Sequence, residues 1–434
     1  MLSRKLYYLQ WLLKSERWPQ KKIEKFQLKR LKWIINYCYR NIRFYRKVWK
    51  ENDSPKKINC LKDIEKFPII NRKMVMENYS DFIVNYPKKN IFDEKIYYTG
   101  LTSGSSSGHS FRTLINEKTW DLYEAIYLRG LVSIGYSPLK KMSYYWYESY
   151  KKWYHKIRIM RKDFILPSTS VEKQIELIEK FDNPYVYYFP SILYILTKIN
   201  PQFKTRPKAV ITHAEVISKK MRKRIENAFD SKVYDQYGTT EFNEIGWGCE
   251  ENLGYHINSE ALILEIIKNK EKVFGEMGNI IISDLWNTTF PLIRYSIGDL
   301  GMVTHEKCSC GRRLPLLKSV EGRKTDIFHI NKRTITPKTI IDSLDELPLK
   351  KFDFNKIRKD EFLLNFVPLN EHIKKEKITK DIKNKLFITL GKNINLRVQM
   401  NNTPILRRGK FKMVNNQTKQ GLNDIIKLDP FSEK

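Results

Sequence analysis

The hydrophobic and polar residues between Asn183 and Tyr234 alternate between two patterns. Short apolar runs rich in Val, Ile and Tyr predict buried strands, and apolar residues at intervals of three and four predict helices between them. Strands and helices that alternate in this way are typical of a parallel sheet with crossover helices. The strands are predicted at 185–189, 209–212 and 232–234, and the helices at 191–199 and 218–229.

Polar residues follow two of these predicted strands directly. His213, Ala214 and Glu215 come after the second strand, and residues 235–241 come after the third. Ligands of open α/β sheets bind beyond the carboxyl ends of the strands. We therefore expect a ligand site at these two segments, each of which ends in a glutamate.

The first 50 residues carry apolar residues at helical spacing with Lys and Arg between them, for instance at Leu31, Ile34, Ile35 and Cys38. This pattern predicts amphipathic basic helices. Such helices either cover the core of a domain or dock on an anionic membrane surface. The interrupted apolar stripe favours the core and leaves peripheral membrane contact as the alternative.

The pattern changes after Tyr255 to short runs of alternating polarity, which predict an antiparallel β subdomain at about 250–325. Its strands are predicted at 261–267, 278–283 and 291–295. We expect an α/β chain whose large N-terminal domain, 1–326, has mostly parallel sheets, crossover helices and this subdomain. Residues 327–434 show strand and helix patterns and a basic end, which predict a small mobile α+β domain.

Seven small residues in a row mark the most unusual stretch of the chain: Thr102, Ser103, Gly104, Ser105, Ser106, Ser107 and Gly108. Such a loop lets a phosphate approach backbone N–H groups closely, although a flexible linker has a similar composition. Flanking residues 96–98 and 111–115 read as strands, which favours a hairpin tip. A helix with Asn116 as its N-cap is predicted to follow at 117–134.

Aromatic residues are dense at 144–147 and at 153–154. Apolar walls with few polar groups can hold a carboxylic acid with a bulky tail. Aromatic runs also form buried strands, so the sequence leaves both interpretations open.

The chain of 434 residues is strongly basic, with a formal net charge of +32. Its Lys and Arg residues are spread from end to end, whereas a nucleic-acid site concentrates them on one element. We therefore expect no nucleic-acid partner. The sequence shows no secretory signal and an odd number of cysteines, five, so we expect a cytoplasmic protein without a disulfide framework.

Four residues of the types that bind zinc lie in two groups along the chain. Cys249 and His256 form one group, and Cys308 and Cys310 form the other. Three thiolates and an imidazole make a closed tetrahedral zinc set, which is structural because no position remains for water. Unrelated buried cysteines are the alternative, since the spacing is looser than in zinc fingers.

Several of these segments, in order, resemble the adenylate-forming ligase superfamily, and most specifically its phenylacetate–coenzyme A ligase branch, which includes homologues in capsular polysaccharide loci. The matching segments are the loop at 102–106, Ala214-Glu215, the Tyr-Gly-x-Thr-Glu motif at 237–241, Pro291–Leu300, the Gly-Arg-x-x-Asp motif at 322–326 and Arg407–Lys410. The chain departs from the family pattern at Ser107 and at His213, because both stand where the family has glycine. The branch also carries Cys and His at the places of the zinc set.

The resemblance implies a role for each matching residue. The loop binds phosphate, Ala214 and Glu215 border the adenine, Tyr237 lies beside it, and Gly238 also belongs to the nucleotide site. Thr240 contacts the α-phosphate and Glu241 binds Mg²⁺. Asp299 holds the ribose, Arg323 binds nucleotide, Asp326 is the hinge of the mobile domain, and Lys410 is the catalytic lysine.

The function that the resemblance implies is ATP-dependent activation of a carboxylic acid as an acyl-adenylate, followed by transfer to an acceptor. Coenzyme A is the acceptor expected by default, and an amine of an amino acid or amino sugar is the alternative. Two hypotheses come from other functional classes: a basic zinc-containing nucleic-acid-binding protein and a non-catalytic scaffold. Release of pyrophosphate in the presence of ATP and an acid separates the enzyme from both.

Overall fold

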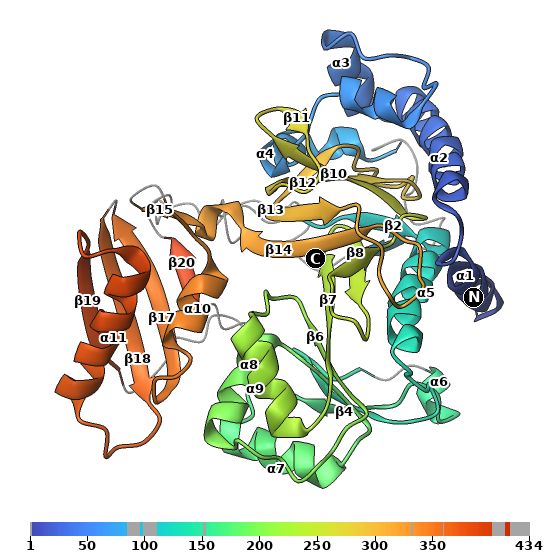
Figure 1. Cartoon of the computed structure of the whole chain (residues 1–434). Helices are drawn as coiled ribbons and strands as arrows, with labels where there is room; N and C mark the ends of the chain where they lie inside the picture. The colour runs from blue at the N-terminus through green and yellow to red at the C-terminus, as the bar shows by residue number, and fades with distance from the viewer. Residues whose placement is uncertain are drawn as a thin grey trace. The chain divides into compact units, whose positions relative to one another are not determined.

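The structure, a computed structural model, describes residues 2–84, 96–98, 111–150, 153–330, 333–358, 360–401 and 413–416. The chain divides into two compact units, whose helices and strands are coloured in chain order in Figure 1. The described residues of the first unit lie within 2–133 and 237–320, and those of the second lie within 134–236 and 321–416. The predicted domain boundary at residue 326 stays a prediction.

The predicted N-terminal helices are present in the first unit. They are α1 (Leu2–Ser15), α2 (Gln20–Asn41) and α3 (Arg43–Glu51), and α4 (Arg72–Glu77) and α5 (Glu117–Ser133) follow. Leu31, Ile34, Ile35 and Cys38 of α2 are all buried in the core of this unit. The apolar stripe that a membrane contact would need is therefore covered. Among the described residues, no helix has the length and apolar character needed to cross a bilayer.

The strands of the first unit are mainly antiparallel, as predicted. They are ordered β11-β10-β12-β13-β14-β9-β8. Their bounds are β8 (Asn243–Gly248), β9 (Tyr255–Ile257), β10 (Leu262–Lys268), β11 (Glu271–Lys272), β12 (Gly278–Asp284), β13 (Tyr295–Thr304) and β14 (Leu316–Arg323). A separate hairpin pairs β1 (Ile96–Tyr98) with β2 (Leu114–Asn116), which confirms that the strands around the small-residue loop are antiparallel neighbours.

The strand predicted at 291–295 is wrong except for its last residue, because β13 begins at Tyr295. Arg294 has a positive φ of 50°, which no extended strand accommodates. The Tyr45 hydroxyl also forms hydrogen bonds with the backbone of this segment. It donates to the carbonyl of Pro291 and accepts from the N–H of Ile293. These contacts occupy two backbone groups that a strand would pair with a neighbouring strand.

The second unit contains the parallel sheet that the alternation predicted. Its strands are ordered β7-β6-β5-β3-β4, and neighbouring strands are parallel. The strands are β3 (Met142–Tyr145), β4 (Lys162–Ile165), β5 (Tyr185–Tyr188), β6 (Ala209–His213) and β7 (Val233–Thr239), and residues 237–239 of β7 belong to the first unit. The helices are α6 (Trp153–Lys156), α7 (Val171–Phe181), α8 (Pro190–Ile199) and α9 (Lys219–Phe229).

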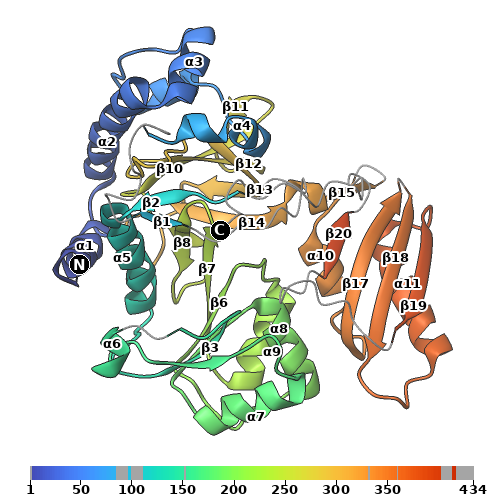
Figure 2. The same ribbon diagram turned by 180° about the vertical axis from the view of Figure 1, so that it is seen from behind.

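The C-terminal part of this unit is the predicted α+β arrangement. Its sheet is ordered β19-β18-β17-β20, with α11 along one face (Figure 2). The elements are β15 (Phe328–Ile330), β16 (Arg333–Ile335), α10 (Pro337–Leu344), β17 (Leu349–Arg358), β18 (Glu361–Pro368), α11 (Lys375–Leu390), β19 (Asn395–Met400) and β20 (Val414–Asn416). Asp345, which follows α10, accepts hydrogen bonds from Arg224 of α9 at 3.0 and 3.2 Å. Lys198 of α8 donates to the carbonyl of Asp345 as well.

Candidate functional site

Two residues of the matching motifs meet directly in the first unit. Tyr237, near the end of β7, donates its hydroxyl hydrogen to Oδ2 of Asp299 on β13 at 2.8 Å. The Asp299 carboxylate is buried, with 7% of the residue exposed. A buried carboxylate is stable only when hydrogen-bond donors replace the water that it loses. The two residues therefore form one polar unit although 62 positions separate them.

Glu241 lies in the turn between β7 and β8 and is also buried. Its Oε1 is 3.3 Å from Nη2 of Arg72, at the start of α4, and 3.3 Å from the Tyr295 hydroxyl. Both contacts are made by Oε1, and together they fix the orientation of the Glu241 carboxylate. A carboxylate oxygen is a preferred ligand of Mg²⁺, so the residue type fits the role that the resemblance implies.

The turn that carries Glu241 depends on Gly238. A Cβ atom at this position would lie 2.2 Å from the carbonyl oxygen of Asn243. Only glycine allows such a close approach of two backbones. Within the turn, the N–H of Phe242 donates to Oγ1 of Thr239 at 3.3 Å, and Thr240 is half-buried.

The second unit carries the other described residues of the predicted nucleotide site. Ala214, directly after β6, has a φ of 65°, a strained conformation for a residue with a side chain. Oε2 of Glu215 accepts from the N–H of Ser191 at 3.1 Å, in the first turn of α8. A carboxylate at this end of a helix is stabilised by the helix dipole. Arg323 ends β14 half-buried, and Asp326 is buried in the short helix at 324–326.

The predicted phosphate loop, Thr102–Gly108, and the predicted catalytic Lys410 lie outside the described residues. Their assignments stay predictions. Sequence reasoning did not find Arg72 or the role of Tyr295 beside Glu241. Tyr295 could have been found, because it lies inside the matching segment 291–300, whereas nothing in the local sequence marks Arg72.

The structure brings the four predicted zinc ligands together. Their ligand atoms all lie within 4.8 Å of one another. Sγ of Cys249 is 3.5 Å from Sγ of Cys308, and Sγ of Cys310 is 3.3 Å from Nε2 of His256. These separations match the edges of a tetrahedron around a metal ion with bonds of about 2.0–2.3 Å. Cys249 and His256 come from the segments around β8 and β9, and the other two from the loop before β14.

Burial sets the protonation of this cluster. It raises the pKa of the Cys249 thiol and of the Cys308 thiol, so both stay protonated unless a cation offsets the burial. Burial also lowers the pKa of His256 to about 4. The imidazole is therefore uncharged at neutral pH and has a lone pair for a metal.

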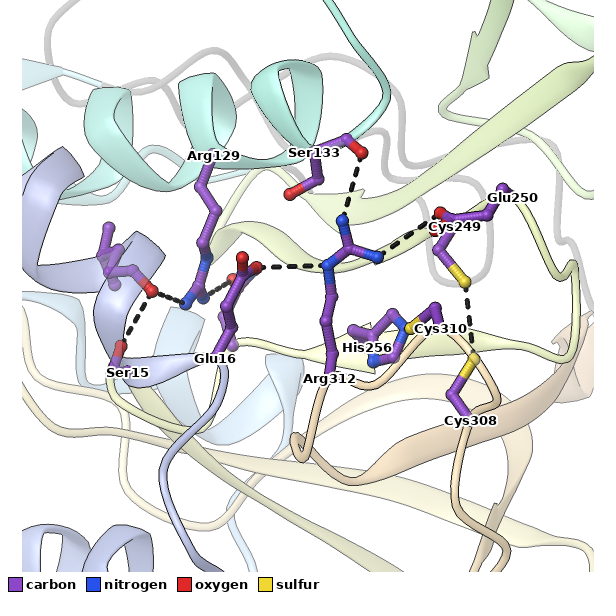
Figure 3. Close-up of polar contacts among 12 residues, drawn as sticks. Ser15, Glu16, Arg129, Ser133, Cys249, Glu250, His256, Cys308, Cys310 and Arg312 are labelled. Atoms are coloured by element: carbon purple, nitrogen blue, oxygen red, sulfur yellow. Dashed lines mark hydrogen bonds and ion pairs between the residues drawn. The ribbon is translucent and has the colours of Figure 1, made fainter.

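Two arginines lie next to the cluster (Figure 3). Arg312 donates to Glu16 and Glu250 at 3.3 Å each and to the carbonyl of Ser133 at 3.1 Å. Arg129 is fully buried, pairs with Glu260 at 2.8 Å and lies over the ring of Trp247. Arg312 also contacts Cys310, so one guanidinium group faces the place where zinc with three thiolates would carry a net charge of −1. The surroundings thus suit the group that the four ligands would hold.

The aromatic segment at 144–147 is divided between the two expected structures. Tyr144 and Tyr145 are buried in β3, whereas Trp146 and Tyr147 follow the strand and Tyr147 is 41% exposed. Trp146 and Phe189 lie at the same sheet edge as His213, since each comes at or directly after the carboxyl end of a parallel strand. This edge is where open α/β sheets bind ligands.

Comparison with known proteins gives homologues that cover most of the chain. No family model matches it. The chain is 24% identical over 352 residues to a phenylacetate–coenzyme A ligase of Thermus thermophilus, which covers 76% of this chain and 77% of the relative. It is 23% identical over 423 residues to the protein CapK of Staphylococcus aureus, which covers 91% of this chain and 89% of the relative.

Solved structures show the same fold. A 2-hydroxyisobutyryl-CoA ligase in its postadenylation state, in complex with 2-HIB-AMP, matches with a TM-score of 0.76 and 20% identity over 92% of this chain and 90% of the other. An anthranilate CoA ligase in complex with anthranoyl-AMP matches with a TM-score of 0.52 and 12% identity over 72% of this chain and 65% of the other. The fold is therefore that of solved acyl-CoA ligases, which form adenylates, and the named relatives agree with the superfamily that the motifs resemble. Among the relatives are phenylacetate–coenzyme A ligases, the branch that the motifs resemble most specifically.

Proposed function

We propose that this chain is an ATP-dependent carboxylic acid ligase that works in two steps. In the first, a carboxylate oxygen attacks the α-phosphorus of ATP, an O–P bond forms, and the bond to pyrophosphate breaks. In the second, the thiol of coenzyme A gives up its proton and attacks the acyl carbon, and AMP leaves as the C–S bond forms. The products are acyl-CoA, AMP and pyrophosphate.

The described residues supply parts of the nucleotide site. The Tyr237 ring would lie beside the adenine and the Asp299 carboxylate would accept hydrogen bonds from the ribose hydroxyls. Glu241 would hold Mg²⁺, which neutralises phosphate charge as the two anions approach. Arg72 and Tyr295 position the Glu241 carboxylate through its Oε1.

The observation that carries this proposal is the hydrogen bond between Tyr237 and Asp299, because it joins two motifs that the chain order keeps far apart. The test is release of pyrophosphate from ATP by the purified protein with a panel of carboxylic acids. Coenzyme A and hydroxylamine are offered as alternative acceptors, so that thioester and amide-forming chemistry are read separately. Absence of acid-dependent pyrophosphate release across the panel would contradict the proposal.

Removal of the Tyr237 hydroxyl tests the ribose arrangement. Tyr237→Phe takes one donor from a buried carboxylate, which costs about 1–3 kcal/mol and leaves Asp299 less well positioned. We expect KM for ATP to rise by roughly 5-fold to 100-fold, with a smaller change in kcat. Tyr39→Phe on α2 is the matched control and should leave both constants unchanged. An unchanged KM in Tyr237→Phe would separate this pair from the nucleotide.

We also propose that Cys249, His256, Cys308 and Cys310 bind one structural zinc ion. The support is the closeness of the four ligand atoms and the two guanidinium groups beside them. A closed site of four protein ligands stabilises the fold and takes no part in the reaction.

Metal analysis tests the zinc proposal. Protein prepared without chelator should contain about one zinc per chain. Cys308→Ser should lose this zinc and unfold at a temperature roughly 5 °C lower or more, because the metal contributes to the free energy of folding. The exposed Cys60 provides the control, since Cys60→Ser should keep both the zinc and the melting temperature. Zinc-free protein with the parent's stability would exclude the site.

A further inference from the structure

Rings from three neighbouring strands of the second unit pack around His213. The centroid of the imidazole is 4.2 Å from that of Tyr187, 4.9 Å from that of Phe189 and 5.6 Å from that of Trp146. The planes of the imidazole and of Trp146 differ by only 23°. His213, Tyr187 and Phe189 are 7%, 3% and 0% exposed, so the centre of this group is closed to solvent.

The ring distances leave no slot for a further aromatic group. A ring inserted between two others needs about 7 Å between their planes, because carbon atoms approach to roughly 3.5 Å. Centroids at 4.2–5.6 Å are those of rings in direct contact. The hydroxyl of Tyr187 is held as well, at 3.0 Å from Oε1 of Gln236 on β7. The group is therefore a filled cluster, and no further ring can lie between its side chains.

The cluster occupies the carboxyl edge of the parallel strands, where a ligand of this fold is expected. His213 precedes Ala214 and Glu215, which are residues of the predicted nucleotide site. Under the proposed function, the tail of the acid would lie near these strand ends, because ligands of open α/β sheets bind there. The side chain of His213 fills space that glycine, the residue of the resembling motif, would leave empty.

We infer that His213 and Trp146 set the size limit of the acid, and that the substrate is a short-chain aliphatic acid and not an aryl acid. This inference rests on the proposed ligase function. The two residues act as specificity determinants, because they exclude a bulky tail without touching the reacting atoms. Removing either side chain opens a space that a phenyl group can enter.

The test compares the parent with His213→Ala and Trp146→Ala. Pyrophosphate release is measured with acetate, propionate and lactate on one side and with benzoate and phenylacetate on the other. In the parent, kcat/KM for the best short-chain acid should exceed that for phenylacetate by about 10-fold or more. Each variant should raise the ratio of phenylacetate to propionate by about 10-fold or more. The exposed His372 gives the control, and His372→Ala should keep the parent's ratio.

Each outcome decides between the alternatives. A parent enzyme that prefers phenylacetate, or folded variants with an unchanged ratio, would overturn the inference while the ligase function stands. Failure of every acid with every protein would remove the proposed function itself. Thermal unfolding identifies a variant that does not fold. If His213→Ala does not fold, the ratio measured with Trp146→Ala decides, because Trp146 is less buried than His213 and its removal disturbs the core less.

Discussion

Replacement of Glu241 by alanine is expected to lower the rate of pyrophosphate release by about 100-fold or more. The phosphates of ATP and the attacking carboxylate are all anions, so the site must supply compensating positive charge. Glu241→Ala removes the proposed ligand of Mg²⁺ and leaves Arg72 without its carboxylate partner. Both changes disturb charge in a buried place, where it matters most.

A matched variant separates charge from shape. Glu241→Gln keeps an oxygen that can accept from Arg72 and Tyr295 but loses the negative charge. It should therefore fold like the parent, and its rate should fall nearly as far as that of Glu241→Ala. If Glu241→Gln released pyrophosphate at the parent's rate, the carboxylate would act only as a partner of Arg72, and the metal role would be excluded.

The parallel sheet could be predicted because its signals are local. Each strand is a short apolar run, and α9, which connects β6 to β7, begins at a residue whose side chain caps it. Ser218 accepts from the N–H of Met221 at the start of α9, and Asn116 accepts in the same way from the N–H of Thr119 at the start of α5 in the first unit. Period and cap lie within a few residues of each other, so sequence alone contains them.

Features that depend on distant contacts could not be predicted. The segment 291–294 has the composition of a strand, but the Tyr45 hydroxyl and the φ of Arg294 exclude it from the sheet. The stripe of α2 suits either a membrane or a core, and only the packing of the first unit shows which surface covers it. The sequence pattern shows which side of such an element is apolar, but it does not show which segment packs against that side.

The candidate site shows the same division. Motif resemblance identified Tyr237, Glu241 and Asp299, and it identified the four residues of the Cys/His cluster that the structure brings together. It did not identify the contact of Arg72 with Glu241, because 169 residues separate them and no motif includes the arginine. It also left the aromatic residues at 144–147 undecided, since only ring distances distinguish a filled cluster from an open pocket.

The contacts of the C-terminal residues bear on the two-step reaction. Asp345 accepts hydrogen bonds from Arg224 and Lys198, and leucines of α8 share one apolar core with β17. If residues 327–434 alternate between two arrangements, these contacts must break and re-form. The resemblance assigns Lys410 to the adenylation arrangement and Asp326 to the hinge.

Lys410→Ala is therefore expected to damage only the first half of the reaction. A single cation that neutralises charge on the α-phosphate and the acid is worth about 100-fold or more in rate, and pyrophosphate release should fall by that factor. Transfer from a separately supplied acyl-adenylate to coenzyme A should stay within a few-fold of the parent, because the phosphate charge no longer has to be overcome.

Lys377→Ala on α11 serves as the control and should alter neither half-reaction. Asp326→Pro should instead impair the transfer step more than adenylation, since proline fixes the backbone where the hinge must rotate. Equal loss in both half-reactions of Lys410→Ala, or loss in neither, would exclude alternation of the C-terminal residues between two catalytic arrangements.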